Sequence, residues 1–148
     1  MSASARPTNH EVRELAEVWY MKLDEHAPAG ELLPHVAGDE LQMRFPEATL
    51  RGQSAFVRWY DGVVRKFFDE VHTLKEVTAT PVDGGVQVKV VVNWQARVWN
   101  PPAAKSEWLG FDAYQTWIVK RSERTGRLVI TDYIVDELRP MAGSAALG

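Results

Sequence analysis

One stretch decides the fold of this chain, the run from Leu50 to Leu74, which reads LRGQSAFVRWYDGVVRKFFDEVHTL. Arg51-Gly52 starts a helix in which apolar residues recur at intervals of three and four, as on one broad buried face: Phe56, Trp59, Tyr60, Val63, Val64 and Phe67. The segment after this helix opens a strand in which a histidine, His72, comes early. An amphipathic helix of this kind, laid across a curved sheet, encloses a small-molecule pocket.

The segment before this stretch predicts two further helices and a strand. Beginning at Asn9, with Thr8 or Asn9 as its cap, apolar residues again follow helical spacing: Val12, Leu15, Ala16, Trp19, Tyr20 and Leu23. Ala27-Pro28-Ala29-Gly30 ends this helix, because proline disfavours helix in the residue before it. A short helical turn is expected at residues 31–35 and an alternating strand at residues 41–45.

Four β segments follow, and their spacing indicates the fold class. They are expected at residues 69–80, 86–99, 108–121 and 127–138. Asp83-Gly84-Gly85 supplies a tight hairpin, because glycine accepts a positive φ, and Gly126 supplies a second turn. Helices followed by a run of antiparallel strands predict an α+β domain. Residues 9–138 are expected to form this single domain, with residues 1–8 and 140–148 as flexible termini.

Composition excludes several classes of protein. Charged residues are 25% and hydrophobic residues 45% of the chain, which are ordinary globular values. A formal charge of −3 leaves no basic excess to neutralise phosphates, so nucleic acid is not an expected partner. There is no cysteine, which excludes a disulfide framework or a thiolate site. No secretion signal is recognisable and no segment approaches the roughly 20 apolar residues of a membrane span, so we expect a cytoplasmic protein with no membrane contact.

The strand at residues 86–99 has two distinct faces. Its even positions are all apolar, so this face must be buried: Val86, Val88, Val90, Val92, Trp94, Ala96 and Val98. Its odd positions are mainly polar, but Val91 and Trp99 interrupt them, and Tyr114 and Ile118 continue the apolar surface on the next strand. We therefore expect a homodimer that forms through this outer sheet face.

The next strand carries one polar residue on its buried face, Gln115, among Phe111, Ala113, Trp117 and Val119. An unpaired amide there costs about 1 to 3 kcal/mol, so Gln115 should have a partner in the protein, in water or in a ligand. The last strand is apolar on both faces, and its parity leaves open whether Asp132 or the pair Thr131 and Tyr133 faces inward. A β-bulge would shift this phase by one residue.

The order of these elements resembles the SnoaL-like branch of the nuclear transport factor 2-like and ketosteroid isomerase-like superfamily. The resemblance covers residues 9–138 and rests on element order, the histidine and the glycines: Gly52 followed by Phe56 and Trp59, His72, Gly84-Gly85 and Gly126. It implies a conical barrel, in which a curved, mostly antiparallel sheet wraps around the N-terminal helices. It also implies a cofactor-independent cyclase, isomerase, dehydratase or epoxide hydrolase that acts on a hydrophobic small molecule.

The family's catalytic positions carry over only in part. Ketosteroid isomerases have an aspartate before a proline where this chain reads Phe45-Pro46, and their oxyanion-binding acid falls near Trp117. Limonene-epoxide-hydrolase-like proteins have an arginine and an aspartate two residues apart, where this chain reads Arg97-Val98-Trp99. SnoaL-type cyclases are similar in Gln115 and in the last-strand Asp132, but Trp117 replaces their histidine.

The partial match to cyclases implies acid–base chemistry by Asp132 and Gln115, and His72 is a second possible acid or base. Desolvation disfavours a charged carboxylate, so an inward Asp132 would exchange protons near neutral pH, as an imidazole such as His72 does. Gln115, with Tyr133, Tyr20 or Tyr60, would stabilise charge that develops on a substrate oxygen. Eight aromatic residues are expected to contact the substrate: Tyr20, Phe45, Phe56, Trp59, Tyr60, Trp94, Trp117 and Tyr133.

Each of these assignments has a structural alternative. Asp132 facing solvent, His72 as a packed strand residue and tryptophans that only fill the core would make the chain a non-catalytic ligand-binding or dimerisation module. No metal or cofactor is expected, because the histidines are scattered and have no companion cysteines: His10, His26, His35 and His72.

Overall fold

The computed structural model describes residues 5–147 and has the predicted α+β order. Helices α1 (Asn9–Asp24), α2 (Ala29–Leu32) and the short 3-10 helix η1 (Leu33–His35) come first, followed by β1 (Gln42–Phe45), β2 (Ala48–Arg51) and α3 (Gly52–Lys66). Four long strands complete the chain: β3 (Phe67–Val82), β4 (Gly85–Val98), β5 (Glu107–Arg121) and β6 (Leu128–Pro140). Strand β2 was not predicted. Part of the termini expected to be flexible, residues 1–4 and 148, lies outside the described residues.

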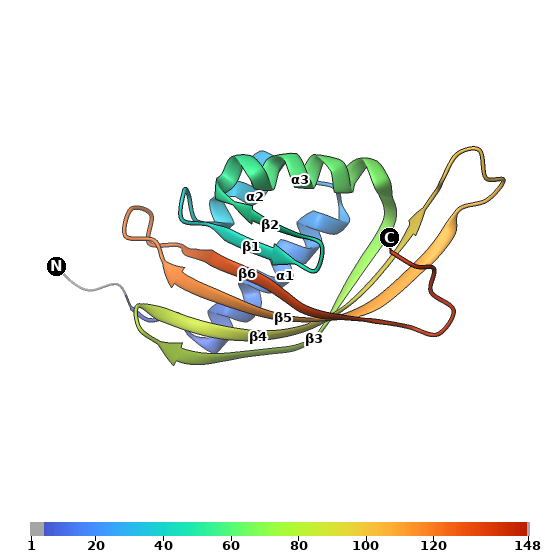
Figure 1. The fold of residues 1–148 in the computed structure, drawn as a ribbon. Helices are drawn as coiled ribbons and strands as arrows, with labels where there is room; N and C mark the ends of the chain where they lie inside the picture. Colours follow the sequence, from blue (N-terminus) through green and yellow to red (C-terminus); the bar gives the residue numbers. More distant parts are fainter. Residues whose placement is uncertain (1–4, 148) are drawn as a thin grey trace.

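All six strands form one sheet in the order β2-β1-β6-β5-β4-β3. Every pairing is antiparallel except that of β1 with β6, which is parallel. In Figure 1, α3 lies above the sheet and the four long strands curve beneath it. The sheet and the helices therefore surround a common interior.

Helix α1 begins at the predicted cap. Thr8 Oγ1 accepts a hydrogen bond from the Glu11 backbone nitrogen at 3.1 Å, and Glu11 Oε1 accepts one from the Thr8 nitrogen at 3.0 Å, which is a capping box. The Arg121 guanidinium donates to both oxygens of the Glu11 carboxylate, at 2.9 and 3.0 Å. These contacts tie the start of α1 to the end of β5.

Helix α3 begins at the predicted glycine, and Gly52 has a φ of 79°, which a residue with a side chain rarely adopts. The helix ends at Lys66, so the prediction that Phe67 belongs to its apolar stripe was wrong. Phe67 is the first residue of β3 and is buried there. Phe56 and Tyr60 form the fully buried part of the stripe.

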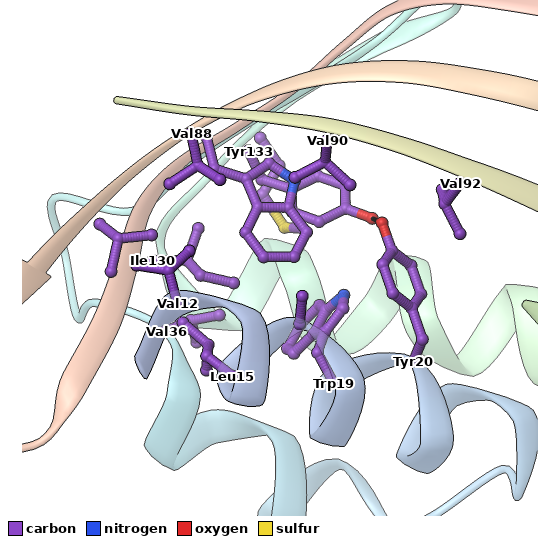
Figure 2. Close-up of a cluster of buried hydrophobic side chains, with 14 of the residues drawn as sticks. Val12, Leu15, Trp19, Tyr20, Val36, Val88, Val90, Val92, Ile130 and Tyr133 are labelled. Atoms are coloured by element: carbon purple, nitrogen blue, oxygen red, sulfur yellow. Dashed lines mark hydrogen bonds between the residues drawn. The ribbon is translucent and has the colours of Figure 1, made fainter. Parts of the chain in front are cut away.

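The predicted parity of β4 is confirmed. Its even positions are buried throughout, apart from a half-buried Trp94. Figure 2 shows three of them, Val88, Val90 and Val92, on the side of β4 that faces α1. The inward residues of β5 are buried as well, including Gln115 at 6% exposure. A second, smaller cluster lies at the far end of the sheet and consists of Phe67, Ala96, Val98, Leu109 and Phe111.

Strand β6 changes its facing twice. The pairs Val119↔Ile130 and Ile118↔Asp132 leave Thr131 without a partner, and the pairs Gln115↔Val135 and Tyr114↔Glu137 leave Asp136 without one. These irregularities let Ile130, Tyr133 and Val135 all face the interior, although their parities differ. Asp132 points to the other side, where its Oδ1 accepts a hydrogen bond from Thr131 Oγ1 at 2.9 Å. The alternative in which Asp132 faces inward was therefore wrong.

The segment after β6 returns along β5. The Met141 nitrogen donates to the Gly110 carbonyl at 2.8 Å, and the Ala145 nitrogen donates to the Trp108 carbonyl at 2.9 Å. Ala145 and Leu147 pack on the second cluster. Residues 141–147, which the sequence suggested were a flexible tail, thus cover one end of the interior.

The outer sheet face holds the residues expected at a dimer interface. Val91 is buried within the subunit, Tyr114 and Ile118 are half-buried, and Trp99 is 50% exposed. The homodimer stays a prediction.

None of the helices between residues 5 and 147 has the length and apolarity that crossing a bilayer requires.

Candidate active site

The interior contains a cavity of about 1100 Å³ between α3, the end of α1 and the curved sheet. Its walls are mainly apolar and aromatic, and include Phe45, Trp59, Tyr60, Phe67, Trp94, Phe111 and Tyr133. Three buried or half-buried polar side chains of the strands interrupt these walls: Glu70, His72 and Gln115. Five exposed charged residues also border it: Glu47, Arg58, Lys66, Asp136 and Glu137.

His72 is held by Asp24, the last residue of α1. Asp24 Oδ1 lies 2.6 Å from His72 Nδ1, and Asp24 Oδ2 accepts a hydrogen bond from the His72 backbone nitrogen at 2.9 Å. An ionised carboxylate only accepts hydrogen bonds, so Nδ1 donates to Asp24, and Nε2 is the ring nitrogen left for a bound molecule. Because His72 lines the cavity, it is placed as a base for a bound molecule.

Aromatic neighbours fix the plane of the His72 ring. The Tyr20 ring stacks on it with a centroid separation of 4.6 Å and an interplanar angle of 25°. Trp94 lies at 6.4 Å and 27°. Tyr20 and Asp24 are four residues apart on α1 and so lie on the same side of this helix. For this reason the Tyr20 ring can stack on the imidazole while the Asp24 carboxylate accepts its hydrogen bond.

Gln115 has the protein partners that its burial required. Its Oε1 accepts hydrogen bonds from Tyr20 Oη at 2.8 Å and from Trp117 Nε1 at 2.9 Å. An indole nitrogen only donates, so this contact identifies the oxygen end of the amide. Within residues 5–147 no protein group accepts from the amide nitrogen of Gln115, which lies in the cavity wall. This nitrogen is the donor left for a ligand.

The three tyrosines predicted as donors are engaged with other protein groups. Tyr20 donates to Gln115, so the 3.2 Å contact between the hydroxyls of Tyr20 and Tyr133, visible in Figure 2, uses the Tyr133 proton. Tyr60 Oη donates to the Ala27 carbonyl at 2.6 Å. Of the side chains predicted to donate to a substrate oxygen, only Gln115 therefore has a donor without a protein acceptor among the described residues.

Burial keeps these tyrosines neutral. Desolvation, reinforced by the nearby Tyr133, raises the pKa of Tyr20 well above its ordinary value. Desolvation also raises the pKa of Tyr133. Desolvation, with the charges of Glu70 and Glu31, raises the pKa of Tyr60 to about 12. None of the three exchanges protons at physiological pH.

The structure brings most of the predicted site residues to one cavity. His72, Gln115, Phe45, Trp59, Tyr60, Trp94 and Tyr133 all line it. Tyr20, Phe56 and Trp117 lie behind its wall, at most 3% exposed, so the prediction that they contact substrate does not fit their positions. Tyr20 and Trp117 instead hold the Gln115 amide. Asp132 lies outside the cavity and is not placed to act on a ligand there.

Sequence reasoning missed Asp24 and Glu70. One signal was available for Asp24, because a carboxylate in the last turn of a helix opposes the helix dipole and needs another reason to be there. Glu70 carried no comparable signal, since its facing depends on an irregularity in β3. Among residues 5–147, no three His, Asp or Glu side chains gather as a set of metal ligands.

The sequence matches no family model and no curated protein. Solved structures are similar in fold. A hexachlorocyclohexane dehydrochlorinase (LinA, type 2) has a TM-score of 0.73 and 14% identity over 94% of this chain and 93% of that chain. A ketosteroid isomerase-like protein from Erwinia carotovora atroseptica has a TM-score of 0.68 and 14% identity, over 90% and 95%. ActVI-ORFA from Streptomyces coelicolor has a TM-score of 0.61 and 14% identity, over 85% and 93%.

Proposed function

This chain has the conical α+β fold of the nuclear transport factor 2-like, ketosteroid isomerase-like and SnoaL-like proteins, and from that premise we propose that it is a cofactor-independent acid–base enzyme. Its reaction begins with removal of a proton from a carbon next to a carbonyl group of a hydrophobic metabolite. The observation that carries this proposal is the pairing of His72 with Asp24 at the wall of an apolar cavity that also presents the Gln115 amide.

Each residue has a defined part in this step. His72 Nε2 takes the proton from carbon, and the Asp24 carboxylate stabilises the imidazolium that forms. The Gln115 amide nitrogen donates a hydrogen bond to the carbonyl oxygen as that oxygen becomes negative. A positioned general base contributes about 10²- to 10⁴-fold in rate, and one oxyanion donor about 10²- to 10³-fold.

The cavity favours a flat, multi-ring substrate. A volume of about 1100 Å³ is just above the range of ordinary ligand sites, which measure roughly 300 to 1,000 Å³. Phe45 and Trp59 stack on each other at 4.5 Å and 15°, and Trp94 and Phe111 do so at 6.1 Å and 22°. The relatives named as a dehydrochlorinase and a ketosteroid isomerase-like protein support the proposal, because both named reaction types begin with loss of a proton from carbon.

Proton exchange at carbon tests the proposal without knowledge of the natural substrate. The probe is 2-tetralone in D2O, whose α-protons are followed by NMR. The wild-type protein should accelerate deuterium uptake, and His72→Gln should lower this acceleration by about 10²-fold or more. The matched control is His10→Gln, since the His10 side chain is 83% exposed and does not line the cavity, and its replacement should leave the rate unchanged.

Two results would count against this function. Exchange at the buffer rate, with binding of 2-tetralone still visible as quenching of tryptophan fluorescence, would favour the non-catalytic binding module. Equal rates for wild-type protein and His72→Gln would remove His72 from the chemistry.

We also propose that the chain forms a homodimer through the outer sheet face. Trp99 is 50% exposed there. Tyr114 is the half-buried cross-strand partner of Val91, and the half-buried Ile118 lies opposite Gln87 on the same pair of strands, β4 and β5. Sedimentation velocity at micromolar concentration should give the dimer mass, and Ile118→Arg should give the monomer mass. A monomeric wild-type protein would end this proposal.

A further inference from the structure

A β-bulge turns Glu70 into the cavity. Phe68 pairs with Arg97 and Val71 with Gln95, so Asp69 and Glu70 together stand opposite the single residue Ala96. Asp69 has a φ of 52°, a conformation rare for a residue other than glycine. Without this extra residue, strand alternation would turn Glu70 away from the side that Phe67 faces. Bulges that re-aim a side chain are common beside active sites.

The Glu70 carboxyl group has two partners and is almost fully buried. Its Oε2 lies 2.5 Å from His26 Nε2, and its Oε1 accepts a hydrogen bond from Trp94 Nε1 at 3.0 Å. Both His26 Nε2 and Glu70 Oε2 have lone pairs, so a contact this short requires a hydrogen between them, on the nitrogen or on the carboxyl oxygen. A proton that His26 takes up from solvent can pass along this contact to Glu70. The Glu70 side chain is 4% exposed and that of His26 is 26% exposed, so the pair connects the cavity wall to solvent.

The base and this second pair lie on one wall. Glu70 and His72 are two residues apart on β3, which separates their Cα atoms by about 7 Å and points both side chains to the same face. Trp94 touches both, since its indole nitrogen donates to Glu70 and its ring lies parallel to that of His72. Two groups in this arrangement can reach neighbouring carbons of one flat substrate.

We propose that Glu70, supplied with protons through His26, is the catalytic acid that protonates a departing hydroxyl group, which makes the substrate class β-hydroxy carbonyl compounds and the reaction a dehydration. This inference rests on the proposed function, because His72 must first remove the α-proton. It adds the pair of Glu70 and His26 to the catalytic site, a pair that removal of the α-proton by itself does not use.

The dehydration balances without a co-reactant. His72 Nε2 accepts the proton from the α-carbon, and the electron pair of that C–H bond becomes the double bond between the α- and β-carbons. The bond from the β-carbon to oxygen breaks, its electron pair stays on oxygen, and the Glu70 proton converts the departing group to water. Glu70 regains a proton through His26, and His72 returns its proton to solvent, so the products are an enone and water.

Leaving-group dependence tests the acid. The probes are 3-hydroxy-1-tetralone and 3-acetoxy-1-tetralone, which both yield 1-naphthol by elimination and tautomerisation. Hydroxide needs a proton to leave, whereas acetate does not. Glu70→Gln keeps an oxygen acceptor for Trp94 and should lower the rate for the hydroxy compound by about 10²-fold or more, with the acetoxy rate within threefold. His72→Gln should lower both rates, and Glu76→Gln, on the exposed side of the same strand, should lower neither.

A second variant keeps the test valid where Glu70→Gln fails to fold. His26→Gln leaves the carboxyl group in place and should also slow the hydroxy compound selectively. Equal losses for both probes in the folded variants would mean that Glu70 only positions Trp94, and that result overturns the inference. Wild-type activity on the acetoxy probe alone would overturn it too, while leaving His72 as the base. Inactivity on both probes, together with buffer-rate exchange of 2-tetralone, would overturn the proposed function itself.

Discussion

Asp24→Asn should switch off the proposed base while leaving the fold nearly intact. In the wild-type protein both Asp24 oxygens accept from His72, from Nδ1 at 2.6 Å and from the backbone nitrogen at 2.9 Å. An asparagine has only one such oxygen. If that oxygen keeps the backbone contact, its NH2 group faces Nδ1 and must donate to it. The imidazole proton then moves to Nε2, the atom that needs a free lone pair.

The expected magnitudes separate chemistry from stability. Loss of a positioned base lowers the exchange rate of 2-tetralone by about 10²- to 10⁴-fold. Loss of one hydrogen bond to a charged group costs about 1.5 to 3 kcal/mol of unfolding free energy. For a domain of this size that lowers Tm by about 3 to 12 °C, at roughly 2 to 4 °C per kcal/mol. The variant should therefore be folded at 25 °C and nearly inactive.

Two measurements check this reasoning. Exchange of 2-tetralone gives the rate, and ¹⁵N chemical shifts of the His72 ring identify the nitrogen that carries the proton. Asp61→Asn is the matched control, because Asp61 is an exposed residue of α3 that contacts only Arg65 among the described ion pairs. Asp24→Asn with an exchange rate within threefold of wild type, or with the proton still on Nδ1, would refute the argument.

Two further predictions concern stability. A Cβ at Gly85 would collide with the Val119 carbonyl oxygen, so Gly85→Ala should lower the unfolding free energy, measured by urea denaturation, by about 1 to 3 kcal/mol. The control is Gly30→Ala, where no atom lies within 4 Å of the added Cβ and no such loss is expected. Equal urea midpoints for the two variants would contradict this prediction. The raised pKa values of Tyr20 and Tyr133 mean that the native state keeps protons that the unfolded chain loses above about pH 10. Their contribution to stability is thus complete below about pH 10 and declines as the pH rises further. Urea denaturation at pH values below and above about 10 will measure this decline, and an unchanged unfolding free energy would count against the prediction.

The elements of the fold were predictable because their signals are local. The apolar spacing of α1, the glycine that starts α3 and the all-apolar even face of β4 each depend on residues close in sequence. The boundary of α3 was predicted less well, because Phe67 fits the helical spacing and also begins β3. Strand β2 was missed because it has only four residues, which are too few to show the alternation of apolar and polar side chains that marks a strand.

The candidate site was predictable only in part. His72 and Gln115 stood out as polar residues of apolar strands, and both line the cavity. Asp24 and His26 are 48 and 44 residues from their partners His72 and Glu70, and no local pattern reports such a pair. The resemblance to cyclases favoured Asp132, whose facing depends on the bulge at Thr131.

The amino-acid sequence by itself determined that helices precede a long antiparallel sheet and that one face of this sheet is apolar, since periodicity follows from backbone geometry at each residue. Only the tertiary structure decided which carboxylates meet which histidines. In the described strands, four single-residue irregularities, near Glu70, Lys75, Thr131 and Asp136, each reverse the facing of the residues that follow on the same strand. Such bulges arise from the bending of the whole sheet around α1 and α3, a property that no short stretch of the chain contains.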